Sequence, residues 1–212
     1  MIKLITNKEQ KIFVSSDFHY SHTNIVRGVT RWRNDYGEID NDAVRDFDTL
    51  EEMNERLVLN INSTVGENDI LFHLGDWSFG GEDNISLFRN RLHCKNIHNI
   101  FGNHDHHIKR KEYLQKNFIS VHDYLHLQID DFNFILQHYP IASWDGIRKE
   151  YIHLYGHVHT KNNFKLGPGK CIDVGVDGHL EFRPYNIITE IVPIMENQPI
   201  DSYINQKFAG RL

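Results

Sequence analysis

Five short stretches of the sequence combine histidine with acidic or amide side chains. In chain order they are Asp17-Phe18-His19, Gly75-Asp76, Gly102-Asn103-His104-Asp105, His138 and Gly156-His157-Val158-His159. Their donor atoms are oxygen and nitrogen without a thiolate, a set that suits Mn, Fe, Zn, Ni or Co better than a structural zinc site or an iron–sulfur cluster. Two such ions held together can activate water and neutralise a phosphoryl group. The stretches therefore predict metal-dependent hydrolysis at phosphorus.

The first two stretches each suit a different task at such a centre. Asp17 and His19 are two residues apart, so an extended backbone would aim both side chains to one side and let them chelate one ion. Asp76 follows a glycine that allows close backbone approach, and its carboxylate has two oxygens with which to bridge two cations. Taken alone, each pair is also compatible with an ordinary turn or helix cap.

The later stretches supply imidazoles and an amide. His157 and His159 flank one valine after an apolar run, which would place two imidazoles near each other. Asn103 precedes His104, whose neighbour Asp105 offers a carboxylate that can orient the ring and keep it protonated. A tight turn is the alternative for this segment. His138 is an isolated residue, and His153 is the alternative candidate for the same ligand position.

The elements that must position these side chains alternate along the first half of the chain. Apolar runs over residues 11–15, 69–74 and 96–101 predict strands, and three- and four-residue apolar spacing predicts helices over 42–62 and 82–92. This alternation predicts an α/β sheet. Ligands gather beyond the carboxyl ends of strands in such sheets, and each candidate residue follows a predicted strand.

The second half is richer in strands. A basic helical stretch over 108–116 precedes a predicted hairpin of strands 124–129 and 132–137, and further strands are expected over 151–155 and 171–174. Residues 166–169 read as a turn, and 186–195 as a strand or a short helix limited by Pro193. No repeat or linker marks a boundary, so we expect one domain over residues 1–212.

Composition limits the kinds of binding partner and the cellular compartment that we expect. The net charge of −6 and the isoelectric point near 6.2 make binding to extended nucleic acid unfavourable, whereas a small anionic substrate can be neutralised by metal ions. There is no apolar run of membrane-spanning length, and Cys94 and Cys171 form no disulfide framework or metal pair. We expect a soluble cytoplasmic protein with no membrane partner. Five of the 15 histidines are assigned to ordinary surface or capping roles: His93, His98, His122, His126 and His153.

The ordered set resembles the signature of the calcineurin-like metallophosphoesterase superfamily, which reads D-x-H, G-D, G-N-H-D/E, H and G-H-x-H and here spans residues 17–159. The resemblance implies a four-layer α/β/β/α sandwich of two mixed sheets flanked by helices. It implies two divalent transition-metal ions, with Mn expected first and Fe, Zn, Ni or Co as alternatives. By matching position, one ion takes Asp17, His19 and His159, the other takes Asn103, His138 and His157, Asp76 bridges them, and His104 is the general acid.

Departures from the signature indicate the branch of the superfamily. Protein phosphatases and dinucleoside tetraphosphate hydrolases carry an arginine soon after G-D, but here Asp76 is followed by Trp-Ser-Phe-Gly. The chain instead resembles small bacterial and phage-type phosphoesterases, through the D-x-H-x-x-H-x-N-I pattern over residues 17–25, the segment 173–177, and Arg183-Pro184. His22 belongs to that pattern and is expected to contact the substrate. Asn103 and His104, from the third stretch, are expected to contact it as well.

The resemblance implies attack on phosphorus by a hydroxide that bridges the two metals, with a small nucleotide-like phosphodiester as the favoured substrate. The alternatives are a phosphomonoesterase, a binding scaffold that kept the fold but lost most chemistry, and a nuclease acting on nucleic-acid ends. Oligomeric state stays open. Basic and aromatic side chains are weaker candidates for substrate contact: Arg27, Arg31, Trp32, Arg33, Trp77 and Trp144. Of these, Trp77 and Trp144 are considered as stacking surfaces.

Overall fold

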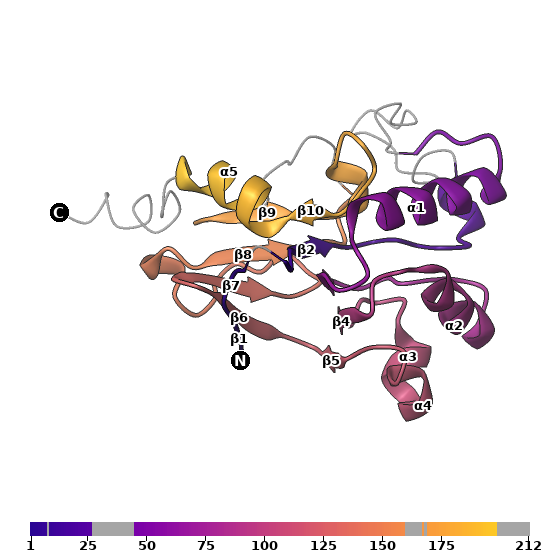
Figure 1. The fold of residues 1–212 in the computed structure, drawn as a ribbon, viewed down its shortest axis with the longest axis horizontal. Coiled ribbons are helices and arrows are strands. Elements are labelled where there is room, and N and C mark those ends of the chain that lie inside the picture. The colour runs from indigo at the N-terminus through magenta and orange to yellow at the C-terminus, as the bar shows by residue number, and fades with distance from the viewer. Residues whose placement is uncertain (8, 27–44, 160–166, 168, 199–212) are drawn as a thin grey trace.

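Two five-stranded mixed sheets are stacked face to face (Figure 1). The structure is a computed structural model that describes residues 1–7, 9–26, 45–159, 167 and 169–198. In the first sheet only β10 is antiparallel to its neighbour, and the order is β10 (Tyr185–Asn186), β2 (Ile12–Ser15), β3 (Ile70–His73), β4 (Asn96–Ile100) and β5 (Ser120–His122). In the second sheet only β6 and β7 pair antiparallel, and the order is β1 (Ile2–Leu4), β6 (Leu125–Ile129), β7 (Phe132–Leu136), β8 (Ile152–Tyr155) and β9 (Cys171–Asp173).

The alternation of side chains along the strands explains the layers. In β2, Ile12 and Val14 face the second sheet and share a core with Phe134 and Leu154, whereas Phe13 faces the helices on the other side. Because the first sheet is covered on both faces, its parallel strands read as continuous apolar runs. That pattern is why these strands were predictable from the sequence.

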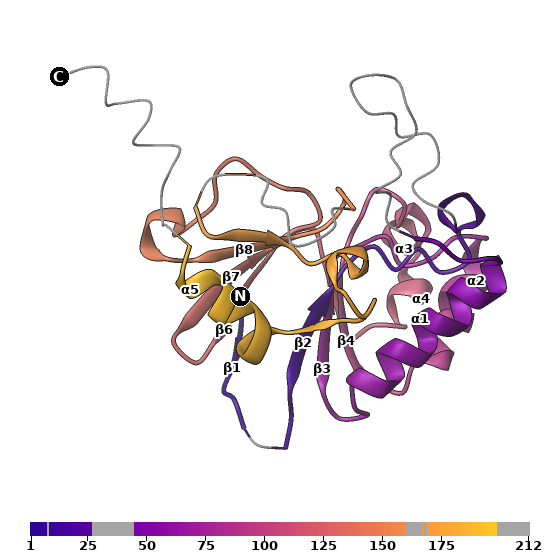
Figure 2. The same ribbon diagram turned by 90° about the horizontal axis from the view of Figure 1, so that it is seen from above.

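Four helices lie on the outer face of the first sheet, which therefore sits between them and the second sheet (Figure 2). They are α1 (Leu50–Thr64), α2 (Glu82–Arg91), α3 (His106–Arg110) and α4 (Glu112–Gln115). The helical stretch predicted over 108–116 is divided between α3 and α4, because Lys111 adopts an extended backbone. The loops of the described residues also contain single turns of 3₁₀ helix: η1 (Thr23–Ile25), η2 (Ile147–Lys149) and η3 (Val176–Gly178).

The first helix begins later than the sequence predicts. Residues 42–44 lie outside the described part of the chain, and residues 45–49 are not helical. The Thr49 side chain accepts a hydrogen bond from the Glu52 backbone N–H at 3.1 Å, and the Glu52 carboxylate accepts from the Asp48 N–H at 2.9 Å. This N-cap fixes the start of α1 at Leu50. The predicted start near residue 42 is therefore wrong, and residues 45–49 precede the helix.

The last described segment is a short helix, one of the two forms predicted for it. β10 leads into a π-helical turn, η4 (Ile187–Ile191), and then into α5 (Val192–Glu196), with Pro193 in the first turn of α5. Ile187, Ile191 and Met195 extend the core between the sheets. Two mixed sheets with flanking helices confirm the predicted α/β class. Among the described residues, no helix has the length and apolar character needed to cross a membrane.

Candidate metal centre

The five stretches meet at one edge of the stacked sheets. Asp17, Asp76 and Asn103 each come shortly after a strand of the first sheet, namely β2, β3 and β4. His138 follows β7, and the pair at 157 and 159 follows β8, both in the second sheet. Because neighbouring strands in each sheet run parallel here, their carboxyl ends converge and bring residues distant in sequence into one centre.

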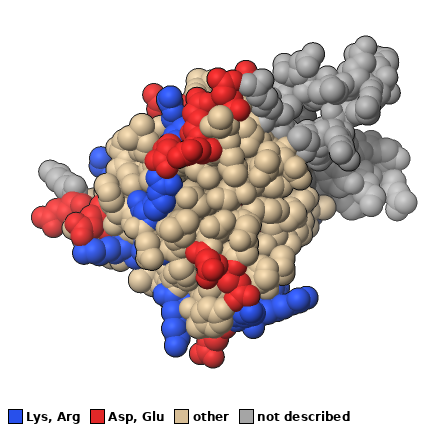
Figure 3. Space-filling model, turned by 90° about the vertical axis from the view of Figure 1, so that its right-hand side faces the viewer, with Lys and Arg blue, Asp and Glu red and all other residues tan. Residues whose placement is uncertain are grey.

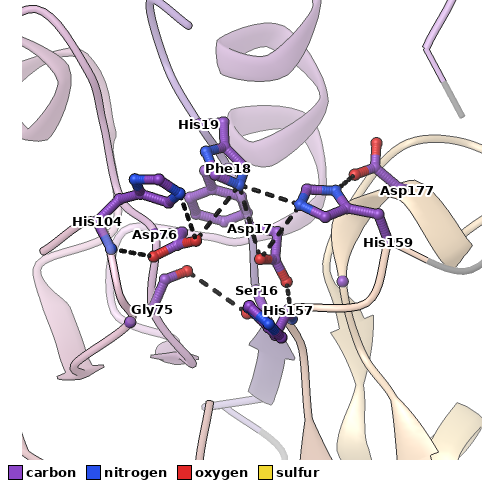
Figure 4. A network of polar contacts seen from close by, with 12 residues as sticks. Ser16, Asp17, Phe18, His19, Gly75, Asp76, His104, His157, His159 and Asp177 are labelled. Atoms are coloured by element: carbon purple, nitrogen blue, oxygen red, sulfur yellow. Dashed lines mark hydrogen bonds and ion pairs between the residues drawn. The ribbon is translucent and has the colours of Figure 1, made fainter. Parts of the chain in front are cut away.

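Asp17, His19 and His159 form the first ligand cluster (Figure 4). One donor atom from each lies within 4.8 Å of the others. The Nε2 atoms of His19 and His159 are 3.1 Å apart, and both lie 3.7 Å from Asp17 Oδ1. Metal–nitrogen bonds of about 2.1 Å place adjacent ligand nitrogens about 3 Å apart. Asp17 Oδ1 is buried and accepts no hydrogen bond, so a cation there would satisfy a buried anionic oxygen.

Asp76, His138 and His157 form the second cluster, again with donor atoms within 4.8 Å of one another. The side-chain oxygen of Asn103 joins it, at 2.9 Å from His138 Nε2. Asp76 Oδ2 lies 3.6 Å from His138 Nε2 and 3.5 Å from His19 Nε2. One carboxylate oxygen thus faces an imidazole of each cluster, which is the position that a bridging ligand requires.

Left-handed backbone conformations aim these side chains. Asp17, His19, Asp76, His157 and His159 all have positive φ, between 49° and 73°. The expectation that residues 17–19 are extended is therefore wrong. A non-glycine residue in this region is strained and persists only where its surroundings hold it. Such strain concentrated at five candidate ligands is characteristic of a functional site.

Glycines next to the ligands allow the two sheets' loops to touch. A Cβ atom on Gly75, whose φ is 99°, would lie 2.5 Å from the Gly102 nitrogen and 2.8 Å from His138 Nδ1. A Cβ atom on Gly156 would lie 2.3 Å from Asp17 Oδ2. These positions accept glycine alone because the backbones of different stretches approach one another there.

Hydrogen bonds fix the ring orientation of His138. Its Nδ1–H donates to the Leu74 carbonyl at 2.7 Å, which leaves the Nε2 lone pair directed at Asn103 and Asp76. The rival, His153, lies buried in β8, where Nδ1–H donates to Ile135 O and Nε2 accepts from the Ile141 N–H. The structure thus brings His138, and not His153, to the centre.

Two residues behind the first cluster were not singled out from the sequence. Asp177 accepts a hydrogen bond from His159 Nδ1 at 2.6 Å (Figure 4) and forms an ion pair with Arg45 Nε at 2.7 Å. Arg45 also donates to the backbone carbonyls of Asp17 and Phe18 at 2.6 and 3.1 Å. Through Asp177, Arg45 therefore links the backbone of the first stretch to His159 in the last. Asp177 lay in a segment already noticed for its family resemblance, whereas Arg45 carried no local signal.

Asp105 does not orient His104, contrary to the sequence prediction. Its carboxylate accepts hydrogen bonds from the backbone N–H groups of Asp76, Trp77 and Gly102, at 2.9, 3.0 and 2.9 Å. It therefore joins the second and third stretches. The His104 side chain is 43% exposed, with Nε2 4.0 Å from Asp76 Oδ2, and burial lowers the pKa of the ring. His104 thus lies at the open side of the centre, where a substrate can reach it.

The other predicted substrate contacts divide into three groups. His22 lies beside the centre, with its ring 5.2 Å from that of His19 and stacked at 3.6 Å on Phe79. Trp77 and Trp144 are buried in the hydrophobic cores, so the prediction that they offer stacking surfaces is wrong. The remaining candidates lie outside the described residues: Arg27, Arg31, Trp32 and Arg33.

The charges at the centre favour uptake of cations. Burial raises the pKa of Asp76 to about 8, and the carboxylates of Asp17 and Asp105 add to the rise. Burial opposes a proton on His159, but Asp17 and Asp177 outweigh it and raise the pKa of that ring to about 9. Without a cation these groups must hold protons to limit repulsion. Metal ions would replace those protons, as is usual when carboxylates and imidazoles become ligands.

Comparison with known proteins places this centre in a family. Residues 10–184 match the family model described as calcineurin-like phosphoesterase. The uncharacterized protein MJ1445 of Methanocaldococcus jannaschii is 26% identical over 202 residues, which cover 92% of this chain and 97% of that protein. The crystal structure of the protein of unknown function AQ665 from Aquifex aeolicus has a TM-score of 0.57 and 21% identity, and covers 83% of this chain and 95% of that one. The last likeness shows a shared fold.

Proposed function

Because this chain belongs to the calcineurin-like phosphoesterase family, a group of metal-dependent hydrolases, we propose that it hydrolyses a small phosphodiester at a dinuclear metal centre. One ion would be held by Asp17, His19 and His159, and the other by Asn103, His138 and His157. The observation that carries this proposal is the place of Asp76 Oδ2, 3.5 Å from His19 Nε2 and 3.6 Å from His138 Nε2. An oxygen between the two clusters is what two ions with a shared ligand need.

When bound, two divalent transition-metal ions, Mn foremost, would supply a nucleophile at neutral pH and neutralise charge on the phosphoryl oxygens. The chain's own residues shape the rest of the reaction. Asp177 and Leu74 each accept the Nδ1–H of a ligand histidine, so Nε2 of His159 and of His138 stays free to bind. The two rings are thereby set before a substrate arrives.

His104 is the group placed to move a proton. Its Nε2 is 4.0 Å from Asp76 Oδ2 on the exposed side of the centre, within reach of a leaving oxygen on a phosphorus bound there. General acid catalysis of this kind contributes roughly 10² to 10⁴ in rate. His22, whose ring centroid lies 6.2 Å from that of His104, and Asn103 would contact the phosphoryl group.

Charge favours a small substrate over a polymer. The net charge is −6, and on the face shown in Figure 3 acidic and basic side chains are interspersed around a largely uncharged middle. Among the described residues on that face, no continuous basic track for a nucleic-acid backbone is visible. A long polyanion would gain little there, because its binding depends on releasing counterions to many cationic side chains.

The experiment is an assay of metal-depleted protein reconstituted with Mn, Ni, Zn or Mg. The substrates are a phosphomonoester, a linear diester and a cyclic diester. We expect turnover of a diester to return with Mn and to disappear again with a chelator. His93→Ala, an exposed histidine away from the centre, is the matched control for His104→Ala. Full turnover by the metal-depleted protein, or a monoester preferred over both diesters, would contradict the proposal.

A further inference from the structure

Phe79 lies among three histidines that the proposed function uses. With His19, His22 and His104 it forms a cluster of rings in which every pair of ring centroids is between 3.6 and 6.2 Å apart. His19 is a candidate metal ligand, His22 a candidate substrate contact and His104 the candidate proton donor. Phe79 is the one member whose side chain has no polar atom. It therefore contributes to the centre through ring contacts alone.

The backbone of Phe79 is fixed on both sides. Its N–H donates to the Tyr20 carbonyl at 2.7 Å, and its own carbonyl accepts from the Asn84 side-chain amide at 2.8 Å. A Cβ atom on the next residue, Gly80, would lie 2.1 Å from Asn84 Nδ2, so a larger residue there would displace that amide. The loop that carries Phe79 is thus bound to the segment that follows the first stretch.

One face of the Phe79 ring is covered by His22. Their centroids are 3.6 Å apart and the ring planes differ by 7°, which is a parallel stack. The centroid of His104 lies 4.7 Å from that of Phe79 and 6.2 Å from that of His22. Because His22 lies over the face of Phe79, these distances place His104 against the edge of the Phe79 ring. Tilted contacts at such distances are among the arrangements that aromatic rings prefer.

Among the described residues, none makes a hydrogen bond to the His104 ring. The Asp105 carboxylate is used by backbone N–H groups, and Asp76 Oδ2 lies 4.0 Å from His104 Nε2, which is too long for a hydrogen bond. The backbone N–H of His104 does donate to Asp76 Oδ1 at 2.9 Å, so the main chain is fixed. Contacts with neighbouring rings are therefore what sets the direction of the imidazole.

We propose that Phe79 is a positioning residue that holds the His104 imidazole in the direction needed to protonate the leaving oxygen. The edge of Phe79 blocks one side of the His104 ring, and the stack with His22 keeps Phe79 itself from turning. A general acid must lie within hydrogen-bond reach of the oxygen that it protonates, and a displacement of about 1 Å can cost roughly 100-fold in rate.

The proton transfer belongs to the hydrolysis already proposed. The oxygen of water bonds to phosphorus, the bond from phosphorus to the leaving oxygen breaks, and a proton on the His104 ring passes to that oxygen. The proton that water releases restores His104 through the solvent. This inference rests on the proposed function and adds a residue, outside the metal ligands, on which the transfer depends.

The test measures kcat of the Mn-loaded protein for two diesters of similar size, methyl para-nitrophenyl phosphate and methyl para-methylphenyl phosphate. The nitrophenol leaves readily without a proton, whereas the methylphenol needs one. Phe79→Leu should lower kcat for the methylphenyl ester by about 10- to 100-fold and for the nitrophenyl ester by less than about threefold. Phe79→Tyr keeps the ring and should retain the wild-type ratio of the two. Phe132→Leu, which removes an exposed ring at the start of β7, is the control and should also retain it.

A double variant separates positioning from general destabilisation. If Phe79 acts through His104, Phe79→Leu should change kcat for the methylphenyl ester by less than about twofold once His104 is already replaced by alanine, because coupled residues are not additive. The Mn content of Phe79→Leu should equal that of the wild type. A full loss in the His104→Ala background, an equal loss on both esters, or a loss of Mn would each overturn the inference.

NMR of the histidine ring protons in metal-depleted protein gives a readout independent of turnover. The ring current of Phe79 should displace the His104 ring signals in the wild type and in Phe79→Tyr, and this displacement should be lost in Phe79→Leu. Unchanged His104 signals in Phe79→Leu would overturn the inference and leave the proposed function standing. If the wild type hydrolysed neither ester, the proposed function would fail, and the NMR comparison would still decide whether Phe79 holds the His104 ring.

Discussion

Asp177 holds His159 by a 2.6 Å hydrogen bond from the ring Nδ1, although neither residue lies in a regular strand or α-helix. The carboxylate is kept ionised: burial would raise its pKa, but Arg45 and His159 outweigh burial and lower the pKa to about 2. An ionised carboxylate only accepts, so the ring must carry its proton on Nδ1 and present Nε2 to the centre.

Asp177→Asn should therefore weaken metal binding at the first cluster. An amide can donate as well as accept, so it no longer fixes the tautomer of His159. Loss of such a partner typically costs 10- to 100-fold in metal affinity. Competition of the two proteins with a fluorescent chelator for Mn measures the change. Asp131→Asn, on an exposed turn, is the control. Equal Mn affinity for Asp177→Asn and the wild type would refute this role.

Arg45→Met should destabilise the protein. The substitution keeps an unbranched apolar stem but removes the guanidinium that pairs with the buried Asp177 carboxylate and donates to the carbonyl oxygens of Asp17 and Phe18. Removing one member of a buried ion pair typically costs about 3–5 kcal/mol. Urea unfolding should show this loss, whereas Arg56→Met on the exposed face of α1 should change stability by less than about 0.5 kcal/mol. Identical unfolding midpoints for the two variants would contradict the bracing role.

Stability should fall as the pH is lowered from 6.5 to about 4, partly through His153. Burial lowers the pKa of this histidine from 6.5 to about 4. The folded pKa lies below the unfolded value, so the unfolded state binds more protons in this window and the free energy of unfolding rises with pH. Both ring nitrogens are used only by the neutral tautomer, because Nε2 accepts from the Ile141 N–H.

The check is urea unfolding at several pH values for the wild type and His153→Gln. Between pH 4 and 6.5, the free energy of unfolding of the variant should depend on pH less steeply than that of the wild type, by up to about 1.4 kcal/mol per pH unit. A pH profile parallel to that of the wild type would show that His153 does not contribute.

His104→Ala should slow diesters with poor leaving groups by about 10²- to 10⁴-fold and have far less effect on those with good leaving groups. A leaving oxygen that is stable as an anion needs no proton. The slope of log kcat against leaving-group pKa, compared between the two proteins, measures this. His93→Ala should keep the wild-type slope. If the His104→Ala slope matched it as well, His104 would not be the general acid.

The strands and the convergence of the five stretches were predictable because buried parallel strands leave a simple signal. Apolar runs such as residues 69–74 end just before polar residues, and parallel pairing places those ends together. Five local signals in order were therefore enough to anticipate one shared centre.

What escaped prediction depends on contacts between segments far apart in sequence. Arg45 and Asp177 are 132 residues apart, and neither sits in a pattern that specifies the other. Periodicity predicted that the first helix includes Arg45, whereas the Thr49 cap starts the helix at Leu50 and Arg45 pairs with Asp177 instead. The left-handed backbone of Asp17 and His19 is likewise held by contacts with neighbouring loops, since Asp and His tolerate this conformation but do not require it.

Whether Asp76 bridges two metal ions is measured by the Mn content and the electron paramagnetic resonance spectrum of the reconstituted protein. We expect two Mn ions per chain with the spectrum of a spin-coupled pair. We also expect Asp76→Asn to lose the coupling and at least one ion. One ion per chain in the wild type, or two ions without coupling, would contradict such a bridge.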